Sequence, residues 1–274
     1  MSVGARYYTD PSCPWSWSAE PVLRRLMVEF GDNLSWTYVM GGLARDYTKS
    51  PGGPEALLAH WLDVAADGRM PIDPRLWRES AIGSSYPACI AVKAAAEQAS
   101  DGGYRYLRVV REGLMCFRRK LDAVEALVEE ARRARLDVER FRVDLASNAM
   151  VEEFGNDLEE VRHPPPEAEH VVRGGEHRRF SFPSVSFGGI SFVALTEPYE
   201  QVRAAALAGG AHPVDAAPPA IEEALRRFGA MATSEVAEVC QLPGPRAPAE
   251  LWRLASEWKV RPVDVLTGEL WELA

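Results

Sequence analysis

The sequence predicts a mixed α/β domain that carries a long all-helical insertion and is followed by a small C-terminal module. A strand–helix–strand pattern opens the chain, residues 55–162 show almost unbroken helical periodicity, and a Gly- and Pro-rich segment at 209–219 precedes the last part. With 274 residues, 47% of them hydrophobic, the chain is long enough for one large domain or two smaller ones.

The first unit is predicted to be a strand at 6–9, a helix at 14–30 and a strand at 34–40. The second strand reads Leu-Ser-Trp-Thr-Tyr-Val-Met, which is β-branched and aromatic, as strands tend to be. A strand–helix–strand unit of this length favours a parallel pair joined by a right-handed crossover.

Residues 55–162 form the predicted helical insertion, which is too long to be a simple connection. Apolar residues recur there at three- and four-residue spacing, and Asp122 and Asp137 stand at plausible N-cap positions. The periodic segments are 55–66, 86–99, 104–119, 123–135 and 138–146.

A second β unit follows the insertion and completes a predicted domain at 1–208. Strands are expected at 178–182, 184–187 and 190–195, with a Gly-Gly turn that marks a hairpin. A helix at 198–208 closes the unit.

After the predicted linker at 209–219, residues 220–274 are expected to form a small winged-helix-like module. Helices are predicted at 220–228, 234–241 and 248–259, followed by a hairpin of strands 260–265 and 269–273.

The charge of this module argues against DNA binding. Its six basic residues are outnumbered by nine acidic ones, whereas duplex binding needs surplus positive charge. Docking on the rest of the chain or on a protein partner is therefore favoured. Trp252, Trp258 and Trp271 are expected to anchor its core, and one of them could serve an interface.

The overall charge of −9 likewise disfavours nucleic acid and anionic membranes as partners. No apolar signal-peptide core and no membrane-spanning run is found, so a cytoplasmic protein is expected. Four cysteines lie far apart, and His163, His170 and His177 have no cysteine or carboxylate cluster beside them. We therefore expect neither disulfides nor a metal site.

The most informative stretch is Ser12-Cys13-Pro14-Trp15-Ser16-Trp17, at a predicted strand-to-helix junction. A cysteine at a helix start faces unpaired N–H groups and the positive end of the helix dipole, which favour the nucleophilic thiolate. The spacing is that of a Cys-x-x-Cys redox motif, but Ser16 replaces the second cysteine. Ser16 is expected to donate a hydrogen bond to the Cys13 thiolate.

Three segments together resemble the DsbA-like branch of the thioredoxin superfamily, particularly its cytoplasmic FrnE-type members. The likeness covers about residues 5–208, and its Asp-Pro and Glu-Pro framing is also similar to SpxH-type adaptors, which deliver a regulator to a protease. The three matching segments are 10–21, 84–96 and 182–184.

The resemblance implies a thioredoxin-like fold in which Pro183 is a cis-proline that faces Cys13. The backbone of Phe182 would then pair with an extended substrate segment, while Pro14 and Trp15 shape the pocket. Tyr86 is expected to line the same groove.

For function, the sequence predicts thiol–disulfide exchange by Cys13 alone. A serine hydroxyl cannot resolve a mixed disulfide, so a low-molecular-weight thiol would act as co-substrate, with no bound cofactor. Cys89 is either a distant resolving thiol or a small buried residue. Two alternatives remain: a non-catalytic adaptor that binds a protein in the same groove, and a relative of kappa-type glutathione transferases or isomerases.

Overall fold

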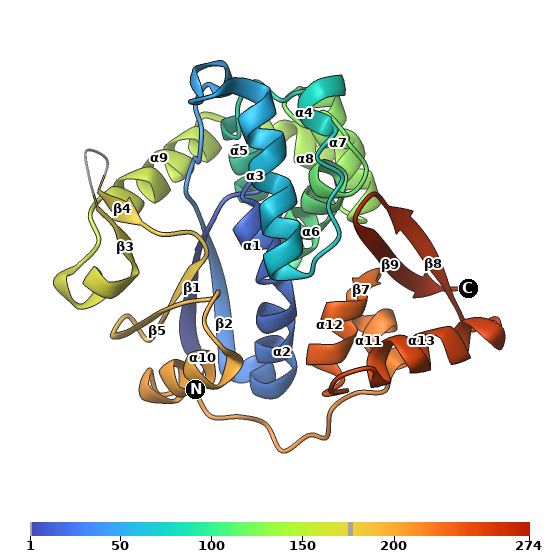
Figure 1. Cartoon of the computed structure of the whole chain (residues 1–274). Coiled ribbons are helices and arrows are strands. Elements are labelled where there is room, and N and C mark those ends of the chain that lie inside the picture. The colour runs from blue at the N-terminus through green and yellow to red at the C-terminus, as the bar shows by residue number, and fades with distance from the viewer. Residues whose placement is uncertain (1, 175–177) are drawn as a thin grey trace.

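A four-stranded mixed sheet forms the centre of the larger domain in the computed structural model, which describes residues 2–174 and 178–274 (Figure 1). Its strand order is β2-β1-β5-β6, and β1 pairs parallel with β2, which confirms the predicted crossover unit. β5 runs antiparallel to both β1 and β6. The strands are β1 Val3–Thr9, β2 Leu34–Met40, β5 Ser184–Phe187 and β6 Ser191–Ala194.

The helices of the insertion pack on one another above the sheet in Figure 1, and α5 and α9 contact β2. α10 contacts β5 and β6, while α2 leads from the N-terminal loop back to β2. The helices of this domain are α1 Pro14–Ser18, α2 Glu20–Phe30, α3 Gly53–Gly68, α4 Leu76–Glu79, α5 Tyr86–Ala96, α6 Gly102–Met115, α7 Val124–Arg133, α8 Val138–Leu145, α9 Asn148–Arg162 and α10 Tyr199–Ala208.

One of the two predicted helix caps is confirmed and the other is wrong. The Asp137 carboxylate accepts hydrogen bonds from the N–H groups of Glu139 and Arg140 at the start of α8. Asp122 does not cap α7, because its carboxylate instead accepts the N–H of Gly83 at 2.7 Å. The Asp122 side chain therefore makes a tertiary hydrogen bond in place of the helix cap that the local pattern predicted.

A small two-stranded sheet is formed by β3 (Val172–Arg173) and β4 (Arg179–Phe180). This is shorter than the strand predicted at 178–182, and β3 was not expected. His177 lies outside the described residues. Among residues 2–174 and 178–274, no cluster of three His, Cys, Asp or Glu side chains suits a metal ion. No helix within those same ranges is long and apolar enough to cross a bilayer.

The C-terminal module has the expected winged-helix-like arrangement, with a short additional strand, β7, that joins the hairpin in the order β7-β9-β8. Trp271 is fully buried in its core, but Trp252 and Trp258 are 56% and 87% exposed, so two of the three predicted anchors are wrong. The elements are α11 Ile221–Phe228, β7 Met231–Ala232, α12 Thr233–Val239, α13 Arg246–Ser256, β8 Val260–Val265 and β9 Gly268–Leu273.

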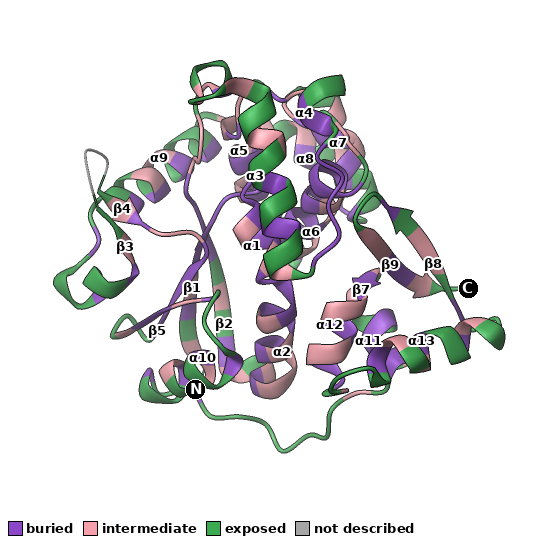
Figure 2. Cartoon of the chain, viewed as in Figure 1, coloured by how far each residue is buried: buried purple, intermediate pink, exposed green. Residues whose placement is uncertain are grey.

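A buried ionic cluster joins this module to the larger domain, where α12 packs against α2. Glu235 of α12 forms an ion pair with Arg24 of α2 at 3.0 Å. It also accepts two hydrogen bonds from the guanidinium group of Arg108 of α6, at 2.8 and 3.0 Å. Beneath them, Arg111 donates to Glu20 at 2.6 Å. These side chains are almost completely buried, as the purple segments of α2 in Figure 2 illustrate. Separating the module from the larger domain would leave these buried charges without partners, which is costly in free energy.

Candidate active-site pocket

Cys13 lies where the chain leaves β1 and enters α1. It is the N-cap residue of α1, and Pro14 follows at the first helical position, where its missing N–H costs no hydrogen bond. The Cys13 N–H donates to the carbonyl of Asp10 at 3.2 Å, which closes a tight turn after the strand. The local sequence therefore fixes the backbone of Cys13 as predicted.

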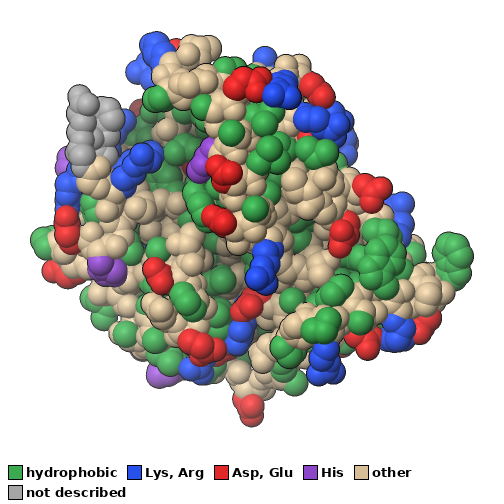
Figure 3. Space-filling view, viewed as in Figure 1, with side chains coloured by type: hydrophobic (Ala, Val, Ile, Leu, Met, Phe, Trp, Pro, Cys, Tyr) green, Lys and Arg blue, Asp and Glu red, His purple; other side chains and the backbone are tan. Residues whose placement is uncertain are grey.

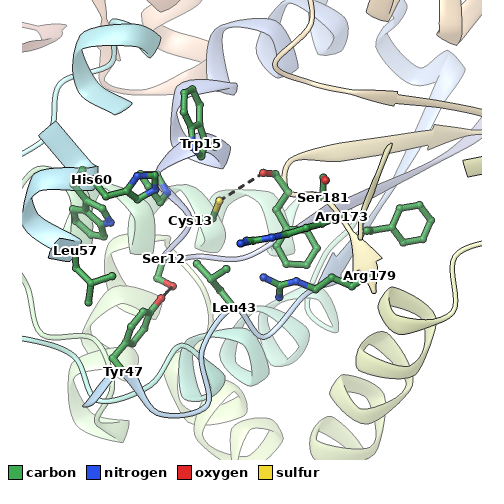
Figure 4. A pocket seen from close by; sticks show the side chains of 14 residues that line it. Ser12, Cys13, Trp15, Leu43, Tyr47, Leu57, His60, Arg173, Arg179 and Ser181 are labelled. Atoms are coloured by element: carbon green, nitrogen blue, oxygen red, sulfur yellow. Dashed lines mark hydrogen bonds between the residues drawn. The ribbon is translucent and has the colours of Figure 1, made fainter. Parts of the chain in front are cut away.

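The loop before β5 brings the Phe182–Pro183 peptide beside the cysteine. β5 pairs with β1 so that Ser184 lies opposite Tyr8, and the Phe182 carbonyl oxygen lies 3.9 Å from Cys13 Sγ (Figure 4). The Phe182–Pro183 bond is cis. The Phe182 ring rests on Gly41, where an added Cβ would come within 1.9 Å of the ring, so only glycine permits this approach.

The pKa of the Cys13 thiol is raised, contrary to the thiolate expected from its position at a helix start. Burial is the main cause, since the side chain is only 4% exposed, and the negative charge of Asp10 acts in the same direction. Ser16 and Arg111 lower the pKa but do not outweigh burial. The helix that Cys13 opens has only five residues, so its dipole is weak.

Ser16 occupies the position of the second cysteine in a Cys-x-x-Cys motif. Its hydroxyl is buried and has no hydrogen-bond partner of ordinary geometry among the described residues. It lies close enough to Cys13 to lower the pKa of that thiol. The site therefore holds a buried polar atom that nothing in the described protein satisfies.

Asp10 organises the floor of the site, a role that sequence reasoning missed. Its Oδ1 accepts the N–H and hydroxyl of Ser12 at 2.8 and 2.6 Å. Its Oδ2 accepts the N–H of Leu43 at 2.6 Å and the hydroxyl of Ser85 at 2.9 Å. A buried carboxylate with this many donors holds three separate loops in place. The Asp-Pro pair just after β1 was the only local sign of it.

Cys89 and Tyr86, both on α5, lie apart from the cavity beside Cys13. The Cys89 thiol is completely buried and donates to Asp10 Oδ2 at 3.4 Å, and burial raises its pKa well above the ordinary value. The Tyr86 ring packs edge-on against Phe154, with centroids 5.0 Å apart. The geometry supports the reading of Cys89 as a small buried residue.

A cavity of about 250 Å³ opens beside Cys13. In Figure 3 this face is hollowed, with hydrophobic side chains in the depth, Lys or Arg side chains at one edge, and His and acidic side chains at the opposite edge. Pro14, Trp15 and Phe182 line the cavity, whereas Pro183 and Ser16 lie outside its lining. The full lining is Ser12, Cys13, Pro14, Trp15, Leu43, Tyr47, Leu57, His60, Trp61, Arg173, Arg179, Phe180, Ser181 and Phe182.

The three basic side chains of this lining were not foreseen from the sequence. His60 comes from α3, and Arg173 and Arg179 come from the small β3–β4 sheet (Figure 4). All three are distant from Cys13 in sequence, and no local motif marks them. Only the tertiary fold brings them together.

Comparison with known proteins places this geometry in a family. The family model described as thioredoxin matches residues 7–162. A curated relative, the ClpXP adapter protein SpxH of Halalkalibacterium halodurans, is 28% identical over 270 residues, which cover 96% of this chain and 86% of the relative. That alignment extends through the C-terminal module.

Two solved structures share the fold of the larger domain. A putative protein disulfide isomerase from Nitrosomonas europaea has a TM-score of 0.61 and 18% identity, covering 75% of this chain and 96% of its own. A probable DsbA oxidoreductase from Streptomyces coelicolor has a TM-score of 0.56 and 19% identity, covering 78% and 93%. Because the family match spans more than half of the sequence, the chain belongs to the thioredoxin family, and the two solved structures agree with it in fold.

Proposed function

We propose that this chain is a protein-binding adaptor that holds a segment of a client protein in the cavity beside Cys13. The observation that carries the proposal is the extent of the likeness to the ClpXP adapter protein, which covers 96% of the chain. The disulfide isomerase and the DsbA oxidoreductase cover only 75% and 78% of it. An adaptor needs a second structural unit beside its client site, and the C-terminal module is such a unit.

The chemistry of the cavity supports binding over catalysis and reverses the order of preference drawn from the sequence. The pKa of Cys13 is raised by burial, so little nucleophilic thiolate forms near neutral pH. Within residues 2–174 and 178–274, no second thiol lines the cavity. The Phe182 carbonyl still faces the cavity and can accept a hydrogen bond from an extended client backbone. We place this adaptor in the cytoplasm, as expected from the sequence.

Crosslinking tests the proposal. A photoreactive amino acid at Ser181, which lines the cavity, is compared with one at Val143, which is 71% exposed on α8. A client captured at 181 and not at 143 is purified, and its degradation by the ClpXP protease of the same organism is followed with and without this chain. We expect faster degradation with the chain, and the same acceleration with Cys13→Ser. Equal capture at both positions, or unchanged degradation, contradicts the proposal.

Monothiol exchange is the second candidate, favoured by the position of Cys13 Sγ in the cavity wall, 3.9 Å from the Phe182 carbonyl. The Cys13 thiolate would attack a substrate disulfide, forming a mixed disulfide and releasing one substrate thiolate, which takes up a proton. A low-molecular-weight thiolate would then attack the substrate sulfur of that mixed disulfide and release Cys13 as thiolate. A second small thiolate would then attack the small-thiol sulfur of the disulfide that has formed on the substrate. This releases the substrate as thiolate and forms a disulfide of the two small thiols.

The two candidates respond differently to one substitution. Cys13→Ser abolishes monothiol reduction of a peptide disulfide by excess glutathione, because no sulfur remains in the cavity. The same variant leaves client delivery by an adaptor intact. Measuring both activities on one preparation separates the two functions.

A further inference from the structure

Two arginines face each other at the rim of the Cys13 cavity. Arg173 on β3 and Arg179 on β4 are direct cross-strand partners, and both line the cavity. Figure 4 shows their guanidinium groups extending from the β3–β4 sheet towards Cys13 and Leu43. Like charges directly opposite on a two-stranded sheet repel each other, so the pair is unfavourable unless something negative lies nearby.

The described residues supply no such anion in the cavity. Its lining includes no Asp or Glu, and neither arginine forms an ion pair within residues 2–174 and 178–274. The charge of Asp10 acts to raise the pKa of Arg179, but both carboxylate oxygens of Asp10 already accept hydrogen bonds from Ser12, Leu43 and Ser85. By contrast, the neighbouring Arg178 pairs with Glu169 on the outside of the hairpin.

Arg179 is also held in a fixed position. Its guanidinium carbon lies 4.9 Å from the centre of the Phe182 ring, which supports a planar cation against the same residue whose carbonyl faces Cys13. Burial and the charge of Arg173 both lower the pKa of Arg179. A preformed guanidinium fork of this kind binds carboxylates through two parallel N–H···O bonds.

We infer that Arg173 and Arg179 form a carboxylate subsite, which binds an acidic group of whatever ligand occupies the cavity beside Cys13. The inference rests on the proposed occupancy of that cavity. It adds the class of ligand: a molecule whose carboxylate reaches the arginine pair while its neighbouring atoms lie along Cys13 and the Phe182 carbonyl. The carboxylate comes either from a Glu or Asp side chain of a client or from a small acidic thiol, and the two sources differ in the probe that binds.

Calorimetric titration of the full chain tests this subsite without any thiol chemistry. The first probe is S-methylglutathione, a tripeptide with two carboxylates and no free thiol, and its dimethyl ester is the control that lacks both carboxylates. The second is a capped pentapeptide with two glutamates, and the same peptide with glutamines is its control. We expect at least one acidic probe to bind, its control without carboxylates to bind at least about tenfold more weakly, and added salt to weaken the interaction.

Arginine variants locate the binding. Arg173→Ala and Arg179→Ala are each expected to weaken the acidic probe at least about fivefold, and Arg179→Lys, which keeps the charge but loses the fork, should fall between. Arg178→Ala is the matched control, because Arg178 lies on the same hairpin and pairs outside the cavity. It should change the affinity by less than about twofold. A thermal melt of each variant identifies any loss of folding, and Arg179→Lys keeps the test decisive if an alanine variant unfolds.

The outcomes of these titrations support or refute the carboxylate subsite. Binding of the tripeptide alone identifies a small acidic thiol, and binding of the pentapeptide alone identifies a client side chain; either supports the subsite. The subsite is overturned if neither acidic probe binds at about 10 mM, if the controls without carboxylates bind as tightly as the acidic probes, or if Arg178→Ala weakens binding as much as Arg179→Ala. Where the pentapeptide binds, client delivery that is unaffected by the arginine variants would refute the subsite as a client site and leave the adaptor function standing.

Discussion

Cys13 shows how strongly the environment of one side chain alters its chemistry. A helix N-terminus favours the thiolate, but the surrounding protein removes water from the sulfur, and burial has the larger effect on its pKa. The same residue in a more open cavity would be a nucleophile. In this structure, the main role of the Cys13 side chain is to line the cavity.

At this scale we predict that alkylation of Cys13 rises with pH with a midpoint above about 8.5, the value of free cysteine. Ser16→Ala should move the midpoint higher still, because Ser16 lowers the pKa of Cys13. The rate of iodoacetamide labelling, followed by mass spectrometry of the Cys13 peptide, gives both values. A Cys13→Ser sample corrects for the other cysteines. A midpoint below 8.5 would restore monothiol exchange as the leading function.

Among the secondary-structure elements, the contact of α12 with α2 and α6 decides how the C-terminal module is attached. Its charged groups are buried, so the contact tolerates little change. We predict that Glu235→Ala lowers the free energy of unfolding by about 3–5 kcal/mol, because Arg24 and Arg108 lose their shared partner while remaining buried.

Chemical denaturation followed by tryptophan fluorescence measures this loss. Glu250→Ala on α13 is a control in the same module, since its ion pair with Arg253 is exposed. We expect that control to change stability by less than about 1 kcal/mol. Equal effects of the two substitutions would mean that the buried cluster does not hold the module in place.

Glu20 gives the same contact a dependence on pH. Burial favours its neutral form, but Arg111, Arg108 and Arg24 outweigh burial and hold its pKa below the ordinary value. The resulting stabilisation is complete above the unfolded pKa of about 4.3 and is lost as pH falls through the lower folded pKa. We therefore predict that the difference in Tm between wild type and Glu20→Gln is largest near pH 7 and shrinks below about pH 4. A constant difference from pH 7 to pH 3 would contradict this.

At the scale of the whole molecule, the hydrophobic core of the larger domain extends into the module, which also has a core of its own around Trp271. Ala232, Val265 and Leu270 of the module belong to the same buried cluster as the residues around Trp17 and Leu23. We predict a single thermal transition by calorimetry, with coincident circular-dichroism and fluorescence curves. Two separate transitions would show that the module unfolds independently.

The sequence by itself determined the parts that local chemistry controls. The parallel β1–β2 unit, the Cys13–Pro14 helix start, the Asp137 cap and the winged-helix-like module all follow from periodicity, capping and turn residues over a few neighbouring positions. The departure at Ser16 from the dithiol motif was equally visible, because both positions lie in one helical turn.

Only the tertiary structure decided which side chains meet at the cavity and what charge state they favour. Arg173, Arg179 and His60 line the same cavity as Cys13 but come from elements far from it in the sequence. Asp122 accepts a hydrogen bond from Gly83 instead of capping the predicted helix. The exposure of Trp252 and Trp258 likewise depends on tertiary packing and not on the local sequence pattern. The reason is physical: burial and electrostatic fields are summed over everything that surrounds a group, and sequence periodicity reports only its neighbours along the chain.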